Sequence, residues 1–90
     1  YSLAQNYPNP FNPSTTIEFN MADNGHAKVD VFNLLGQHVR TLFDGQAEAG
    51  LNQVQWDGTN NTGESVASGV YFYRLSADNY IETKKMTLLK

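Results

Sequence analysis

The richest run of oxygen-bearing side chains in the sequence is residues 57–64, Asp-Gly-Thr-Asn-Asn-Thr-Gly-Glu. Calcium binds several oxygen atoms that a tight turn brings together, and Asp57, Asn61 and Glu64 carry suitable side chains. The spacing differs from that of an EF-hand, which needs Gly at its sixth position and Glu at its twelfth. Asn, Asp and Gly are also usual in a plain loop between strands. The three residues are therefore weak metal-site candidates, and we expect the chain to bind no metal and no cofactor.

The only histidines are His26 and His38. A metal ligand or a general base needs a second group that converges on it, and neither histidine has a Cys, Asp or Glu at ligand spacing. In the expected strand register, Asp30, Asp44 and Asp78 lie near neither histidine, so no Ser-His-Asp arrangement is predicted. We expect both histidines to be exposed. We also expect that the chain is not an enzyme, because ninety residues leave little room for a catalytic cleft.

Three consecutive aromatic residues, Tyr71, Phe72 and Tyr73, allow two interpretations. Successive side chains of a strand point to opposite faces, so at least one ring faces outward and can serve as a stacking platform for a carbohydrate. Alternatively, Tyr71 and Tyr73 belong to the core while a neighbouring domain covers Phe72. The second interpretation is favoured, because large aromatic side chains are mostly buried.

The composition excludes several classes of function. The net charge is −3 and no basic stripe alternates with aromatic residues, so we expect no nucleic-acid partner. The absence of cysteine excludes disulfides and thiol catalysis. No apolar run approaches the roughly 20 residues that span a bilayer, so no membrane insertion is expected. Ninety residues make a single domain, residues 1–90, which we expect to be a monomer.

Short stretches of alternating apolar and polar residues, separated by turn residues, indicate an all-β chain. Three prolines exclude residues 7–13 from a central ladder. Residues 45–50 and 57–69 are predicted to be loops. About seven strands in ninety residues predict an immunoglobulin-like antiparallel β-sandwich. The expected strands are residues 1–6, 15–21, 27–33, 37–43, 51–56, 70–77 and 80–89.

The inward phase of these strands predicts the core. Trp56 is expected to anchor it, because a large aromatic side chain contributes most to packing. The spacing Gly69-x-Tyr71-x-Tyr73 is typical of the tyrosine corner of immunoglobulin domains, in which the Tyr71 hydroxyl bonds to the backbone upstream. The predicted core residues are Ile17, Phe19, Val29, Val31, Val39, Val54, Trp56, Tyr71, Tyr73 and Leu75.

Four segments together resemble a known family. They are residues 1–19, which contain Tyr7-Pro8-Asn9-Pro10-Phe11-Asn12-Pro13-Ser14, and residues 29–39, 68–75 and 83–90. The chain resembles the type A C-terminal sorting domains that are appended to cargo of the type IX secretion system in Bacteroidota and related phyla. The resemblance implies that an upstream cargo domain in the same chain reaches the periplasm by a signal peptide. Outer-membrane components of the system would then recognise the sorting domain, and a sortase-like peptidase would remove it.

The resemblance also implies which residues matter and where the protein is found. Recognition would centre on Gly69, Tyr71, Lys84, Lys85 and Lys90, and the protein would be secreted or held at the cell surface. A partner protein can recognise a last strand at a sheet edge by adding a strand of its own beside it. Because the sequence starts with Tyr rather than Met, we interpret it as a fragment of a larger secreted protein.

One segment departs from the sorting family and leaves alternatives open. Trp56-Asp57-Gly58, Gly63 and Ala67-Ser68-Gly69 are similar to the immunoglobulin-like domain of the flagellar hook-capping protein. That similarity implies a structural or assembly module. A third interpretation, from the aromatic residues, is a carbohydrate-binding accessory module beside a glycoside hydrolase.

Overall fold

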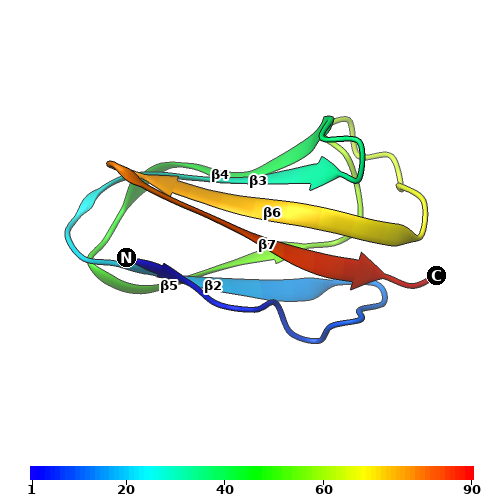
Figure 1. The fold of residues 1–90 in the computed structure, drawn as a ribbon, viewed down its shortest axis with the longest axis horizontal. Helices are drawn as coiled ribbons and strands as arrows, with labels where there is room; N and C mark the ends of the chain where they lie inside the picture. The colour runs from blue at the N-terminus through cyan, green and yellow to red at the C-terminus, as the bar shows by residue number, and fades with distance from the viewer.

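The computed structural model describes residues 1–90 and shows two antiparallel β-sheets packed face to face (Figure 1). A three-stranded sheet has the order β1-β2-β5, and a four-stranded sheet has the order β4-β3-β6-β7. None of the elements is a helix long and apolar enough to cross a membrane. The predicted immunoglobulin-like β-sandwich is confirmed. The strands are β1 (Ser2–Leu3), β2 (Thr15–Met21), β3 (Gly25–Asn33), β4 (His38–Ala47), β5 (Gly50–Trp56), β6 (Gly69–Ala77) and β7 (Tyr80–Leu88).

The passage from β4 to β5 is where the predicted strands differ most from the observed ones. Residues 45–50 were expected to form a loop, but β4 continues to Ala47. Gly45 pairs with Ala27 in the ladder with β3, so the backbone stays extended there. Only Glu48 and Ala49 link the two strands, and they carry the chain from one sheet to the other. Gly50, the first residue of β5, has a φ of +99°, which suits glycine.

Alternating side chains of both sheets form the core, as the sequence predicted. Trp56, Tyr73, Ile17 and most of the other predicted residues are fully buried. Val39 and Val54 are only partly buried, because β4 and β5 lie side by side at a flank where no further strand covers them. The sequence also missed a core residue in the proline-rich stretch. Phe11 is 1% exposed and its ring lies 5.6 Å from that of Trp56.

Candidate functional site

The C-terminal hairpin, β6 with β7, carries most of the residues that the sequence singled out. The two strands pair without a bulge from Gly69 opposite Leu88 to Ala77 opposite Tyr80. Gly69 opens the hairpin with a φ of +150°, a conformation that L side chains rarely adopt. The hairpin therefore places Gly69 directly beside the end of β7.

Tyr71 has the role that its spacing predicted. Its hydroxyl donates a hydrogen bond to the carbonyl of Ala67 at 2.6 Å, and its ring packs edge-on against Trp56 with centroids 5.1 Å apart. Burial raises the pKa of the phenol. The tyrosine corner is confirmed, and its position under the surface means that Tyr71 supports the hairpin from within.

Tyr73, two residues further along β6, ties the N-terminal segment (residues 4–14) to the hairpin. Its hydroxyl donates to the carbonyl of Ala4 at 2.7 Å and accepts the backbone N–H of Asn6 at 2.8 Å. Desolvation of the buried phenol raises the pKa of Tyr73 to about 12. Tyr71 and Tyr73 are therefore core residues, as expected.

The three lysines of the ending do not form a single basic patch. Lys84 shares the inward phase of Met86, and its Nζ lies 3.5 Å from Glu82 Oε2. Lys85 points to the opposite, outer face, where it stands across from Phe72 and is exposed. Lys90 lies beyond the strand and donates to the hydroxyl of Ser65. Any recognition of these lysines would have to engage different faces of the hairpin.

β7 lies at a sheet edge, but its outer side is covered by the chain itself. Phe11 N–H donates to the carbonyl of Thr87, and the Phe11 carbonyl accepts the N–H of Leu89, each at 3.0 Å. The two bonds form a short parallel bridge that an added strand would have to displace. The proline-rich motif and the lysine-rich ending, which lie far apart in the sequence, are therefore neighbours in the fold.

Two side chains of the N-terminal segment extend this cover. Asn9 Oδ1 accepts the N–H of Thr87 at 3.0 Å, and Gln5 Nε2 donates to the carbonyl of Lys85 at 2.8 Å. Sequence reasoning missed these residues, because single polar side chains in an irregular segment carry no periodic signal. The dense Asn-Pro motif was the only sign that the segment adopts a fixed structure.

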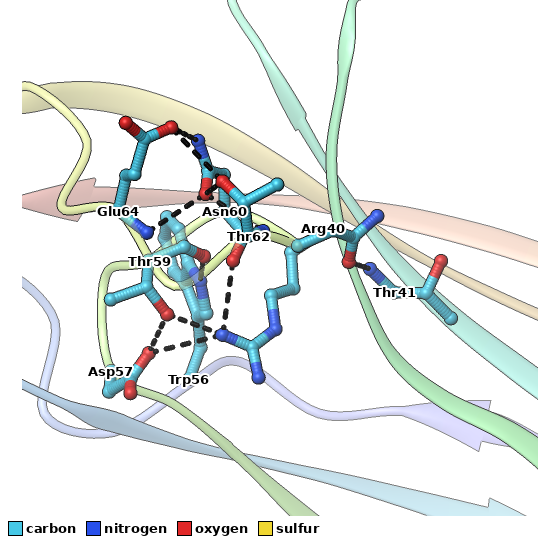
Figure 2. A network of polar contacts seen from close by, with 9 residues as sticks. Arg40, Thr41, Trp56, Asp57, Thr59, Asn60, Thr62 and Glu64 are labelled. Carbon is cyan, nitrogen blue, oxygen red and sulfur yellow. Dashed lines mark hydrogen bonds and ion pairs between the residues drawn. The ribbon is translucent and has the colours of Figure 1, made fainter.

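The loop of residues 57–68 is held together by its own polar groups (Figure 2). Asp57 Oδ1 accepts the hydroxyl of Thr59 at 2.5 Å and lies 3.6 Å from Arg40 Nη1. The hydrogen bond from Thr59 and the charge of Arg40 lower the pKa of Asp57. Glu64 Oε1 accepts the hydroxyl of Thr62 at 3.0 Å. The two carboxylates are therefore bonded within the loop to different groups.

Asn61, the third metal candidate, points elsewhere. Its Oδ1 accepts the N–H of Thr41 at 3.0 Å, and its own N–H donates to the carbonyl of Val39 at 3.2 Å. Asn61 thus covers part of the β4 edge and does not join Asp57 and Glu64. No group of three or more His, Cys, Asp or Glu side chains in the structure is arranged to hold a metal ion.

The expectation that the histidines lack acidic neighbours was wrong. His26 Nε2 lies 2.7 Å from Asp44 Oδ1, and His38 Nε2 lies 2.9 Å from Asp30 Oδ1. Both contacts run diagonally across the β3–β4 ladder, because Asp44 pairs with Lys28 and His38 pairs with Phe32. His26 and Asp44 also lie just outside the expected strands, residues 27–33 and 37–43, whereas β3 and β4 include them. Asp30 also accepts the hydroxyl of Thr41 at 2.8 Å and is only 3% exposed. Both pairs connect β3 to β4.

The outward ring of the aromatic triplet lies on the four-stranded sheet. Phe72 is partly buried there, directly opposite Phe32 on β3. The guanidinium of Arg74 sits 4.6 Å above the Phe32 ring, so one face of that ring already has a partner within the chain.

A separate hollow of about 420 Å³ lies at the end that contains the β2–β3 and β6–β7 turns, and Tyr1, Asp23, His26 and Asp78 are among its lining residues.

This geometry is that of an immunoglobulin-like domain whose sequence motifs meet at one hairpin. The family model of the FlgD Ig-like domain matches residues 11–80. The chain belongs to the FlgD Ig-like domain family. None of the curated proteins matches it.

Solved structures with the same fold come from two settings. Dimeric latent PorU from Porphyromonas gingivalis is similar with a TM-score of 0.77 and 20% identity, over 94% of this chain and 9% of that one. PorZ, a surface component of the type IX secretion system of P. gingivalis, has a TM-score of 0.65 and 24% identity, over 96% and 11%. FlgD from Xanthomonas campestris, described in connection with hook capping in flagellar assembly, has a TM-score of 0.66 and 21% identity, over 88% and 58%. The chain thus spans less than two thirds of each of these structures.

Proposed function

We propose that this domain is a non-catalytic sorting domain, which directs an upstream cargo domain across the outer membrane by the type IX secretion system and to the cell surface. The observation that carries the proposal is the contact between the two most specific motifs of the sorting resemblance. The backbone of Phe11, in the proline-rich motif, bonds to Thr87 and Leu89 in the lysine-rich ending. One compact unit therefore presents both motifs together.

The fold and the surface of the hairpin agree with this role. PorZ, a surface component of a type IX secretion system, contains a domain of the same fold. The exposed side chain of Lys85 and the terminal Lys90 are accessible to a partner that reads the hairpin. In this proposal Gly69, Tyr71 and the Lys84–Glu82 pair shape the hairpin, while Lys85 and Lys90 contact the secretion machinery.

A structural or assembly module is the second candidate, and the FlgD family match over residues 11–80 favours it. The loop of residues 57–68 supports the same interpretation, since its internal hydrogen bonds give it a defined conformation at one end of the sandwich. Under this alternative the domain would link or cap larger assemblies without being read as an export signal.

Export of a reporter distinguishes the two candidates. A periplasm-exported fluorescent protein is fused to residues 1–90 and expressed in a host with a type IX system. We expect the fusion outside the cell, whereas the reporter alone stays in the periplasm. The control is the same fusion in a host strain that lacks the secretion pore. Retention of a folded fusion in several such hosts would refute the sorting function and leave the assembly module.

A further inference from the structure

The sandwich has four sheet edges, and other parts of the chain bond to at least part of three of them. The β7 edge is bonded to the N-terminal segment through Phe11. The β4 edge is bonded to Asn61 at Val39 and Thr41. β1 is two residues long, and Leu3 N–H on it donates to Glu82 of β7 at 3.1 Å. The remaining edge belongs to β5.

The hydrogen bonds of β2 determine which groups of β5 are free. Thr16 exchanges two backbone hydrogen bonds with Tyr7, and Glu18 accepts the N–H of Ala4, so these β2 residues face away from β5. Their ladder partners on β5 are Gln55 and Gln53. In an antiparallel ladder, two opposite residues that do not bond to each other both direct their N–H and C=O groups away from the strand opposite. The N–H and C=O groups of Leu51, Gln53 and Gln55 therefore lie along an open edge.

β5 carries none of the features that usually protect an edge strand. It contains no charged residue and no proline, and its ladder with β2 runs without a bulge. The side chain of Leu51 is 61% exposed. Leu42, Phe43 and Val54, at the flank between β4 and β5, are only partly buried. An added strand would satisfy the backbone groups and cover these apolar side chains at once.

The charges around this edge are acidic. Glu48 stands in the link between β4 and β5. Asp44 lies near the end of β4, where its side chain is 51% exposed and contacts His26 at 2.7 Å. Glu18 accepts the side-chain amide of Gln53 at 2.6 Å on the outer face of the three-stranded sheet. Arg40 on β4 is already 3.6 Å from Asp57. A complementary strand would therefore carry basic side chains on its outward positions.

We propose that the β5 edge is a docking site for an extended segment of another protein, which adds as a fourth strand to the three-stranded sheet. Alternate residues of the segment are apolar and cover Leu42, Phe43 and Val54. The intervening residues are basic and match the acidic surroundings. Main-chain hydrogen bonds provide affinity and the alternation provides specificity, as in other cases of strand addition. This inference is independent of the sorting function.

The probe is a blocked peptide of about nine residues in which Val and Lys alternate, since that length matches an ordinary strand. The labelled domain is titrated with it, and backbone amides are followed by NMR and hydrogen exchange. We expect shifts concentrated on β5, and exchange at Leu51, Gln53 and Gln55 slowed by about tenfold at saturation. A peptide of alternating Val and Glu serves as the charge control and should bind more weakly.

Two variants test the site itself. Gln53→Pro removes the outward N–H without touching a bond to β2, and it should abolish the slowed exchange. Leu51→Lys should weaken binding of the basic peptide by charge repulsion. This variant tests the site even if Gln53→Pro does not fold. The matched control is Ile81→Lys, at a similarly exposed position on β7 that is 67% exposed. Equal binding by Leu51→Lys and Ile81→Lys, or shifts confined to β7, would overturn the proposal. Self-association of the free domain through β5 would also overturn the proposal, because the strand that adds to β5 would then come from a second copy of this domain.

Discussion

Phe11 and Leu88 form a parallel β-bridge, and each side chain is only 1% exposed. The bridge joins the proline-rich segment to the last strand, with the Phe11 ring packed against Trp56 on one side. Prolines before and after Phe11 restrict the backbone, so the unfolded segment loses less conformational entropy when it takes this position. The stability of the β7 end should therefore depend on a residue near the other end of the sequence.

Phe11→Ala should lower the free energy of unfolding by about 3–5 kcal/mol, because it removes a buried aromatic side chain. Amide exchange at Leu89, which donates to the Phe11 carbonyl, should accelerate as well. Denaturant unfolding and hydrogen exchange measure the two effects. Leu89→Ala is the control, since that side chain is 51% exposed and its backbone bond is kept. A Phe11→Ala variant as stable as the Leu89→Ala variant would mean that the segment does not hold β7.

Tyr73→Phe should lower the free energy of unfolding at neutral pH by about 1–3 kcal/mol, because Ala4 and Asn6 lose their shared buried partner. Folding raises the pKa of Tyr73 from 10.0 to about 12, so the folded state favours the neutral phenol. That contribution is complete below pH 10 and is lost as the pH rises through about 12.

Between pH 10 and 12 the parent domain should therefore lose stability more steeply than Tyr73→Phe. The pKa of Tyr71 is also raised by burial, so both proteins share a background slope of the same sign. Denaturant unfolding at several alkaline pH values measures the difference between the two slopes. Parallel slopes would show that Tyr73 ionises as easily in the folded state as in the unfolded state.

The sequence predicted the sandwich because alternation is a local property that tertiary packing preserved. Thr15–Met21 alternates perfectly, and its inward residues are buried as expected. The contacts of His26 and His38 were wrongly predicted, because they are diagonal contacts across the β3–β4 ladder and because both strands extend beyond their expected bounds. The burial of Phe11 was missed for another reason. A residue between prolines has no period, and its partner Leu88 lies at the far end of the sequence.

Calcium should leave the thermal midpoint unchanged, since Asp57, Asn61 and Glu64 are bonded to different groups. A ligand present at a hundred times its dissociation constant would add about 2.7 kcal/mol of stability. Thermal unfolding with excess calcium and with a chelator measures the effect. A calcium-dependent rise of several degrees, lost in Asp57→Asn, would contradict this prediction and identify a site that forms only with the ion.

The last prediction separates the lysines by the face on which each one lies. Lys85→Gln with Lys90→Gln should block export of the reporter fusion while the domain remains folded, because exposed charge changes usually alter stability by less than about 0.5 kcal/mol. Lys28→Gln is the control, since its side chain is 45% exposed on the outer phase of β3 in the same sheet. Asp30, whose carboxylate lies 3.9 Å from Lys28, keeps its contacts with His38 and Thr41 in this variant. It should be exported like the parent.

Lys84 requires a different comparison, because its Nζ lies 3.5 Å from Glu82 and its side chain is 30% exposed. Glu82 has a lowered pKa, chiefly through the hydroxyl of Tyr80, and it also accepts the N–H of Leu3. If Lys84 acts only by supporting this pair, Glu82→Gln should reduce export as much as Lys84→Gln does, with matching losses of thermal stability. If a partner reads Lys84 directly, Lys84→Gln alone should block export. Normal export of the Lys85→Gln, Lys90→Gln and Lys84→Gln variants would show that the basic ending is not a recognition element.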